Sequence, residues 1–406
     1  MTHSSHHNTN SKPLEGITVI DLTQIYQGPY ATFLMAKAGA TVIKIEPILG
    51  EPSRIRAKVS GGASLPMVML NVNKKGITLN LKTDKGKALL KRLIADADIL
   101  VENFTPGVMD RLGVGWDVLH TINPKLIYGS GTGYGLSGPD KDNQAMDVTI
   151  QASSGAMSVT GDPEGPPLRS GSSFIDFLSG VHLYAGIVTA LFDRTRTGIG
   201  RLVEVSMQET AYPTMASNLG LVYRSKGKVP QRVGNRHGGL SLAPYNVYEA
   251  KDGHIAIVCA TEDHWIKILT SMGCENLITD ERFATNKVRV ENIKRTDDFV
   301  EAWTRTITRA ELFTLSKKYG FPAAPVRDLI EVMNDPHMHA RGQLEWFDDP
   351  DLGRVVLPAS PLIIHGTERV KTIASPGLGQ HNDEIYGEKL GMSAQEIQML
   401  KSEGVI

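Results

Sequence analysis

Strand-like and helix-like segments alternate over residues 14–135, and this alternation limits the fold more than any other feature of the sequence. A strand pattern rich in β-branched residues precedes an apolar helical segment at 29–39, and the strand pattern then recurs along the chain; the strand-like segments are 17–23, 41–46, 77–82, 97–104 and 126–135. Strands punctuated by helices favour right-handed crossovers, and hence a mostly parallel sheet covered on both faces. We therefore expect an α/β fold.

Ligands of such sheets bind beyond the carboxyl ends of the strands. This rule selects the loops that follow the expected strands, namely 24–30, 47–56, 71–75, 103–107 and 130–138. One of the crossover helices should begin at Asp84, which stands where an N-cap residue belongs, and run to about Ala95.

The second half of the chain contains two shifts in composition. A long helix from Ser173 to about Arg196 and a strand at 201–207 are followed by a basic, glycine-rich segment at 224–240, and a proline-containing boundary lies at 321–328. These shifts indicate candidate domain boundaries near 224–240 and 321–328.

Composition excludes several classes of function. The formal net charge of −1 gives no general attraction to nucleic acid or to an anionic membrane. Two cysteines cannot build a disulfide scaffold or a multi-cysteine metal site. No segment approaches the ~20 apolar residues needed to span a bilayer. The polar start of the chain does not resemble a secretory signal. Its histidines, His3, His6 and His7, could bind a metal or belong to a frayed polar terminus, and we expect the terminus. We expect a cytoplasmic protein without nucleic-acid or membrane partners.

The first strand–helix turn, QIYQGPYA at 24–31, lacks the G-x-G-x-x-G spacing that accommodates a pyrophosphate. A dinucleotide-dependent dehydrogenase is therefore disfavoured, although Gly28-Pro29 opens a helix whose N-terminus could receive an anion. The sequence contains no Walker motif, G-x-S-x-G elbow or H-E-x-x-H motif. We expect neither a metal nor a permanently bound cofactor.

Four charged residues are candidates for a site, each with an alternative structural role. Lys74, Lys75 and Arg111 follow expected strands and could bind phosphates, or could be solvated surface charges. Asp176 lies between a glycine-rich polar segment and an apolar helix. It could be the N-cap or first-turn acid of that helix, or a carboxylate nucleophile in a poorly solvated site.

Motifs spread over nearly the whole chain carry a family resemblance. They are LEGITVIDLTQIYQGPYATFLMAKAGATVIKIE (14–46), NVNKKGITLNLKTDKGK (71–87), VENFTPGVMDRLG (101–113), YGSGTGYGLSGP (128–139), SVTGDPEGPP (158–167), TRTGIGRLVEVSM (195–207), KDGHIAI (251–257) and DLGRVVLP (351–358). In this order and spacing they resemble the class III coenzyme A transferases of the CaiB/BaiF type, which include formyl-CoA transferase, carnitine CoA-transferase and the α-methylacyl-CoA racemases.

The resemblance implies a CoA-transferase whose substrates are an acyl-CoA and a carboxylic acid. Asp176 falls at the position where these transferases carry their catalytic aspartate. Tyr26 and Gln27 fall in the turn that lies near the thioester and CoA in the relatives. The positions that match CoA contacts are Lys75, Asn103, Phe104, Arg111 and Met207, and those that match an active-site glycine flap are Gly238 and Gly239. It also implies a Rossmann-like large domain formed by residues 14–225 and 329–406, with a smaller α+β domain formed by residues 226–328. The same resemblance implies an interlocked homodimer in which each chain threads through its partner.

The chain departs from the family pattern at several positions. Pro47 replaces an arginine and Gln144 replaces a lysine of formyl-CoA transferase, so those CoA contacts would have to come from elsewhere, for example from Arg54 or Arg56. Met146-Asp147 stands where the racemases carry a His-Asp pair, and methionine cannot move a proton. A racemase-like enzyme and a non-catalytic CoA-binding protein stay as alternatives.

The acids that exchange CoA are not specified by these motifs. The acceptor could carry a second carboxylate, as oxalate, succinate or a related acid does. This carboxylate could pair with basic residues between positions 169 and 237. The candidates are Arg169, His182, Arg224, Arg232, Arg236 and His237. The alternative is that these are ordinary surface charges.

Overall fold

The computed structural model describes residues 12–54 and 64–406, so His3, His6, His7 and Arg56 lie outside the described residues. The chain forms two compact units. Unit 1 comprises Met1–Ile150, Ser173–Thr210 and Asp335–Ile406, and unit 2 comprises Gln151–Ser172 and Ala211–Asn334. The predicted limits of the small domain, 226 and 328, lie inside unit 2, and as domain limits they stay a prediction.

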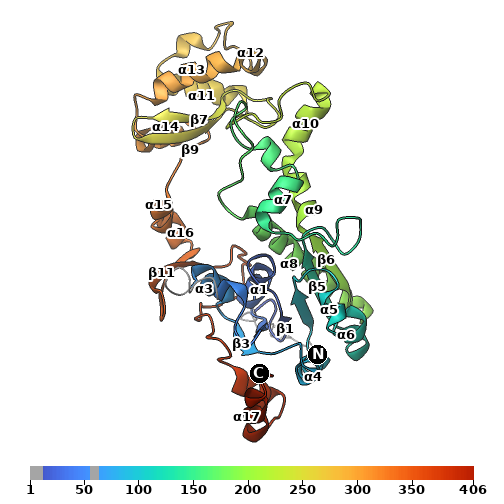
Figure 1. Cartoon of the computed structure of the whole chain (residues 1–406). Coiled ribbons are helices and arrows are strands. Elements are labelled where there is room, and N and C mark those ends of the chain that lie inside the picture. Colours follow the sequence, from blue (N-terminus) through green and yellow to red (C-terminus); the bar gives the residue numbers. More distant parts are fainter. Residues whose placement is uncertain (1–11, 55–63) are drawn as a thin grey trace, which may run out of the picture. The chain divides into compact units, whose positions relative to one another are not determined.

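Unit 1 is built on a six-stranded sheet of order β3-β2-β1-β4-β5-β6. Figure 1 labels β1, β3, β5 and β6 of this sheet. All neighbouring strands run parallel. The strands are β1 (Thr18–Asp21), β2 (Thr41–Glu46), β3 (Lys75–Thr78), β4 (Ile99–Glu102), β5 (Ile127–Thr132) and β6 (Leu202–Ser206). The expected α/β fold with a parallel sheet is confirmed. The order reverses between β1 and β4, which is the switch point where doubly wound sheets bind ligands.

Helices cover both faces of this sheet because successive strand residues point to opposite sides. Val19 and Ile99 pack in one core with α1 (Gln27–Lys37) and α8 (Phe174–Thr197). Their neighbours Ile20 and Leu100 pack in the other core, with α4 (Asp84–Ala95), α6 (Trp116–Ile122) and α17 (Ala394–Ser402). Among the described residues, unit 1 also contains the helices α3 (Leu65–Asn71), α5 (Val108–Arg111), α16 (Pro336–Ala340) and the π-helical turn η4 (Asp383–Lys389). The helices α7 (Asp147–Ser153) and α9 (Met207–Ala211) begin in unit 1 and end in unit 2.

Two sequence-based expectations need correction in unit 1. The N-cap of α4 is Thr83, whose side chain accepts the Gly86 N–H, and Asp84 is the first helical residue. The helix α8 has 24 residues and contains an 18-residue window with a mean hydropathy of 1.5, so by length and composition it could cross a membrane. Core helices share these properties, and α8 packs against the sheet through the buried side chains of Leu183 and Ile187.

Two antiparallel sheets complete the architecture. Unit 2 contains β7 (Tyr245–Ala250), β8 (Gly253–Val258) and β9 (Ala323–Pro325), which contact α13 and α14 and share a hydrophobic core with α11. Its helices are α10 (Ala216–Ser225), α11 (Glu262–Met272), α12 (Asn286–Glu291), α13 (Ile293–Thr304), α14 (Arg309–Tyr319) and α15 (Leu329–Met333), with short 3-10 turns at Met157–Val159, Tyr212–Met215 and Glu275–Leu277. In unit 1, β10 (Leu344–Asp349) pairs with β11 (Gly353–Pro358).

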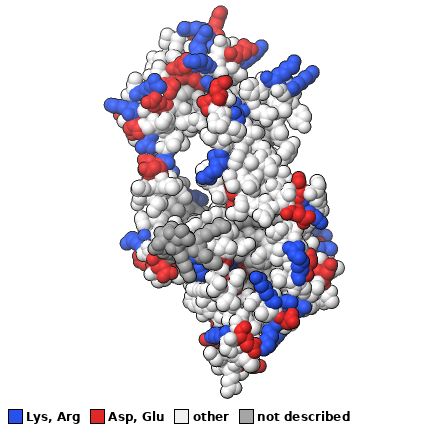
Figure 2. Space-filling view, viewed as in Figure 1, with Lys and Arg blue, Asp and Glu red and all other residues white. Residues whose placement is uncertain are grey.

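Charges of both signs are interspersed over the face shown in Figure 2 and do not gather by sign. This distribution matches the near-zero net charge of the sequence.

Candidate active site

A cavity of about 120 Å³ lies at the carboxyl ends of the central strands of unit 1. It is lined by residues of the loops after β1, β4 and β5, by the end of β5 itself, and by one residue each of α1, α8 and α9. The lining set is Gln24, Ile25, Gln27, Asn103, Phe104, Thr105, Pro106, Gly131, Thr132, Gly133, Asn143, Ala145, Met146, Asp176 and Met207. The cavity therefore lies where the parallel-sheet rule places a ligand site.

Asp176 is in the first turn of α8 and is only 9% exposed. It does not cap the helix. The carboxylate of Asp147 accepts the backbone N–H groups of Ile175 (2.9 Å) and Asp176 (3.2 Å) instead. Burial, and secondarily the negative charge of Asp147, raises the pKa of Asp176 to about 7. A carboxylate here is poorly solvated, as a carboxylate nucleophile requires.

The turn between β1 and α1 forms one wall of the cavity. Ile25 adopts a left-handed backbone (φ 67°), and its N–H donates to the Glu51 carboxylate. The side chain of Asn103 ties this turn to the end of β4, since its Oδ1 accepts the Gln24 N–H (2.8 Å) and its Nδ2 donates to the Gln24 carbonyl (2.9 Å). The turn is thus fixed to the neighbouring loop by a reciprocal amide–backbone pair.

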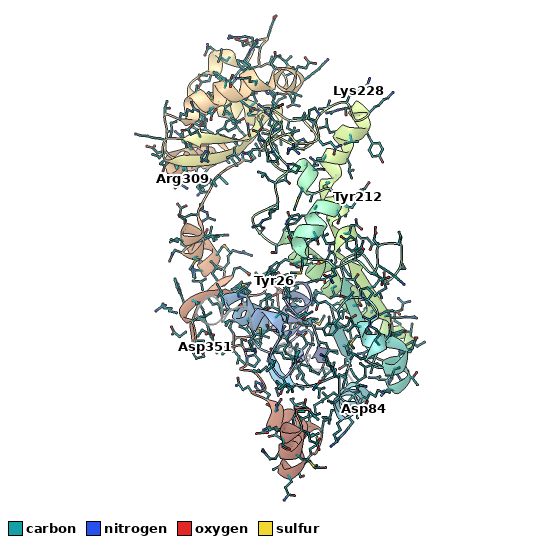
Figure 3. The ribbon with its side chains drawn as sticks, viewed as in Figure 1. Tyr26, Asp84, Tyr212, Lys228, Arg309 and Asp351 are labelled. Carbon is teal, nitrogen blue, oxygen red and sulfur yellow. The ribbon has the colours of Figure 1, made fainter. Side chains whose placement is uncertain are left out.

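Tyr26 and Gln27 point to different surroundings. The Tyr26 ring, labelled in Figure 3, stacks on Phe177 with ring centroids 5.9 Å apart, and Tyr26 is not among the cavity-lining residues. Gln27 lines the cavity and is 3% exposed.

A buried network of ion pairs and hydrogen bonds contacts the turn between β1 and α1. The Lys74 ammonium pairs with Asp21 (2.9 Å) and donates to the Pro29 carbonyl, and Lys44 donates to the Thr23 carbonyl. Burial would raise the pKa of Asp21, but the charges of Lys74 and Lys44 lower it to about 2. Because Lys74 is fully buried and already paired, it is a structural cation and does not serve as a phosphate-binding residue.

The other predicted CoA contacts are divided among several places. Phe104 and the buried Met207 line the cavity with Asp176. Arg111 lines a separate cavity of about 480 Å³. Lys75, at the start of β3, forms an ion pair with Glu384. The structure thus brings Gln27, Asn103, Phe104, Met207 and Asp176 together and places Tyr26, Lys75 and Arg111 outside the same cavity lining.

Among the described residues, which exclude Arg56, the positions that depart from the family pattern supply no free cation near the cavity. Pro47 and Gln144 are exposed. Arg54 is engaged by Glu46 (2.8 Å) and by the Pro376 carbonyl (3.0 Å).

Gly238 and Gly239 belong to unit 2, where Arg224 donates to the Gly239 carbonyl. Their role as a flap stays a prediction. The basic candidates Arg232 and Arg236 are likewise engaged within unit 2, by the Asp162 carbonyl and by Asp297, respectively.

Sequence reasoning named Asp147 only as the partner of Met146 in a comparison with racemases, and missed its contacts with the N-terminus of α8. It also missed the close packing of the Gln27 side chain against Gly131. Gly131 lies at the end of β5, within the selected segment 130–138, whereas Asp147 is the first residue of α7 and lies beyond it. The contacts of both residues depend on chain segments that are distant in sequence.

The model of the family described as CoA-transferase family III matches residues 14–382 of this chain. The chain belongs to CoA-transferase family III. It is 35% identical to succinyl-CoA–D-citramalate CoA-transferase of Chloroflexus aurantiacus, over 97% of this chain and 98% of the relative. It is 38% identical to acetyl-CoA:oxalate CoA-transferase of Acetobacter aceti, over 87% and 90%, respectively.

A solved structure of a CAIB/BAIF family protein from Brucella suis is similar to this chain, with a TM-score of 0.81 and 32% identity. The match covers 93% of this chain and 100% of that protein. The family resemblance seen in the sequence motifs is thereby confirmed, and the family uses CoA thioesters as substrates.

Proposed function

We propose that this member of CoA-transferase family III moves CoA from an acyl-CoA thioester to a carboxylic acid through a covalent intermediate on Asp176. The observation that carries the proposal is the buried Asp176 carboxyl, whose pKa is raised to about 7, in a cavity at the switch point of the sheet. A desolvated carboxylate is a stronger nucleophile toward a thioester than a hydrated one, and a thioester needs no metal or ATP to be attacked.

The reaction proceeds by exchange of acyl groups on Asp176. Its carboxylate attacks the thioester carbonyl, the C–S bond breaks, and CoA leaves as thiolate while a mixed anhydride forms. The thiolate then attacks the aspartyl carbonyl, releases the donor acid, and leaves an aspartyl-CoA thioester. An incoming carboxylate reverses these steps and departs as its CoA ester. One thioester is exchanged for another, so the sequence requires no external energy source.

Dicarboxylic acids are the acceptor class we propose. The relatives reported above are named for D-citramalate and oxalate, both of which carry two carboxyl groups. CoA is the shared substrate, and no permanently bound cofactor enters the mechanism.

Met146 supports transfer over racemisation. Met146 lines the cavity and directly precedes Asp147 in the sequence. The racemases that resemble this chain carry a histidine at the position of Met146. A thioether cannot exchange a proton with the α-carbon of a substrate.

We further propose that the protein is a cytoplasmic, interlocked homodimer. Large apolar side chains are exposed on the outer sides of helices in the single chain, for example Phe192 of α8 (66%) and Tyr223 of α10 (79%). Surfaces of this kind are typical of protein interfaces. The interlocked arrangement itself rests on the family resemblance.

An exchange assay tests the proposed reaction. Purified protein is incubated with acetyl-CoA or succinyl-CoA and with oxalate, malate or citramalate, and new CoA esters are measured by mass spectrometry. We expect Asp176→Ala to abolish their formation while CoA still binds. The matched control is Asp193→Ala on the same helix, whose carboxylate pairs with Arg201 (3.0 Å) and should be dispensable for transfer. Turnover by the Asp176→Ala variant, or solvent deuterium uptake at the α-carbon without exchange, contradicts the proposal.

A further inference from the structure

The side-chain amide of Gln27 is buried without a hydrogen-bond partner. Gln27 is 3% exposed, and its Nε2 makes no hydrogen bond in the structure. An unpaired buried N–H group is destabilising, so native structures rarely retain one without a functional reason. This amide is therefore a candidate for contact with a ligand that the free protein lacks.

Two glycines bring Gln27 close to the neighbouring elements. A Cβ atom on Gly131 would lie 2.8 Å from both Cδ and Oε1 of Gln27, so the amide fits against β5 only because residue 131 has no side chain. A Cβ atom on Gly180 would lie 2.6 Å from the Gln27 carbonyl oxygen. The chain thus packs tightly around Gln27.

The second contact also relates Gln27 to Asp176. Asp176 and Gly180 are four residues apart on α8 and therefore lie on the same side of the helix. The helix side that carries Asp176 is the side that meets Gln27, and both residues line the same cavity.

Attack on a thioester places negative charge on the carbonyl oxygen, and this charge needs hydrogen-bond donors. The residues that line the cavity, all within the described part of the chain, include no lysine, arginine or histidine. Neutral donors must therefore hold the oxygen, and among the lining side chains Gln27 has a buried, unpaired N–H group.

We propose that Gln27 is a catalytic residue that donates a hydrogen bond from Nε2 to the carbonyl oxygen of the acyl group under attack by Asp176. This inference rests on the proposed function and adds a transition-state role for this chain's own glutamine. A carboxylate oxygen of Asp176 forms the new C–O bond, and the carbonyl π pair moves onto the oxygen held by Gln27. When the carbonyl re-forms, the C–S bond breaks and its electron pair leaves with the CoA thiolate.

Gln27→Met tests the role because methionine nearly conserves the shape of the side chain but has no N–H donor. The acyl-enzyme is trapped with hydroxylamine in a single turnover of acetyl-CoA or succinyl-CoA, and the modified Asp176 peptide is quantified over time. We expect the rate to fall about 10²- to 10³-fold, as for loss of one oxyanion donor. CoA affinity should change less than about threefold, and the melting temperature should not fall, because an unpaired buried amide has been removed.

Gln395→Met, on the exposed side of α17, is the matched control and should leave all three quantities unchanged. Trapping in Gln27→Met at the wild-type rate overturns the role of Gln27 while leaving the proposed function intact. A lower melting temperature together with lost CoA binding also overturns it, because Gln27 would then be structural. If the wild-type protein forms no adduct with either acyl-CoA, the proposed function fails, and this inference fails with it.

Discussion

Replacing Asp176 by asparagine removes a buried carboxyl group whose ionisation its surroundings oppose. In the folded protein the pKa of Asp176 is about 7, compared with the usual 3.8. At a pH between 3.8 and about 7, the Asp176 carboxyl group is ionised in the unfolded chain but still protonated in the folded protein. Wild-type stability therefore falls as pH rises from about 4 to about 7, whereas asparagine has no proton to lose at this site.

The size of the effect follows from the two pKa values. A difference of one unit between the folded-state and unfolded-state pKa corresponds to about 1.36 kcal/mol of unfolding free energy. The raised pKa of Asp176 therefore costs the wild type roughly 4 kcal/mol of stability above pH 7. Over the interval from pH 5 to pH 7, the Asp176→Asn variant should gain about 2 kcal/mol relative to the wild type. At about 2.1 cal/mol/K of unfolding entropy per residue, this gain corresponds to about 2 °C in melting temperature for a chain of 406 residues.

The assay compares the thermal unfolding of the two proteins at pH 5, 6 and 7 in one buffer series. Other titrating groups, such as Glu102, whose pKa burial raises to about 7, are present in both proteins and cancel in the difference. We expect the melting temperature of the variant, relative to the wild type, to rise steadily with pH.

The alternative role of Asp176 predicts the opposite sign. A solvated acid in the first turn of a helix is stabilised by the helix dipole by about 0.3–1 kcal/mol, and its pKa is lowered. The variant would then become less stable relative to the wild type as pH rises. That result, or a difference that does not depend on pH, refutes the argument that Asp176 is a desolvated carboxyl group.

The remaining predictions concern the surroundings of this carboxyl group. Asp147→Asn removes a neighbouring negative charge but keeps an acceptor oxygen, so the pKa of Asp176 should fall and the acid limb of the pH–rate profile should move below pH 7; an unmoved limb contradicts this. Gly131→Ala places a Cβ 2.8 Å from Cδ of Gln27, so we expect kcat/KM to fall at least about tenfold with CoA affinity retained, and unchanged kinetics contradict the packing argument. Lys74→Met leaves its carboxylate partner buried and unpaired, and urea unfolding should show a loss of about 3–5 kcal/mol; a loss below about 1 kcal/mol shows that the pair is not structural.

Much of the fold could be predicted because strand patterns and helical patterns depend on local sequence. The segment at 41–46 was expected as a strand and is β2, and the helix expected from Ser173 to about Arg196 is α8. Boundaries were less predictable where neighbouring residues can play the same role. Thr83 and Asp84 are both good N-cap residues, and the structure uses Thr83.

The length of a strand also depends on distant partners. The segment expected as a strand at 77–82 keeps strand geometry only through Thr78, and the Asn80 N–H then donates to the Val405 carbonyl near the end of the chain. The sequence around 77–82 contains no signal for a partner more than 300 residues away.

In the candidate site, too, the state of a residue depends on partners that are distant in sequence. Lys74 and Lys75 are adjacent and chemically alike, yet one is fully buried against Asp21 and the other forms a partly exposed pair with Glu384. Gln27 could be named from the family motif, but its unpaired amide could not, because that state depends on how tightly the chain packs at Gly131 and Gly180. Motifs identify residue types, whereas burial and pairing emerge from tertiary structure.

Transfer of oxygen from the acceptor acid to the enzyme tests the central claim most directly. In the proposed sequence the donor acid departs with one oxygen of the Asp176 carboxylate, and the acceptor acid leaves one of its own oxygens behind. After turnover with acceptor labelled with ¹⁸O in its carboxyl groups, tryptic peptide 170–194 should carry ¹⁸O. Fragmentation should place the label on Asp176 and leave Asp193, in the same peptide, unlabelled. Formation of the new CoA ester with no ¹⁸O on Asp176 would contradict the covalent aspartyl mechanism.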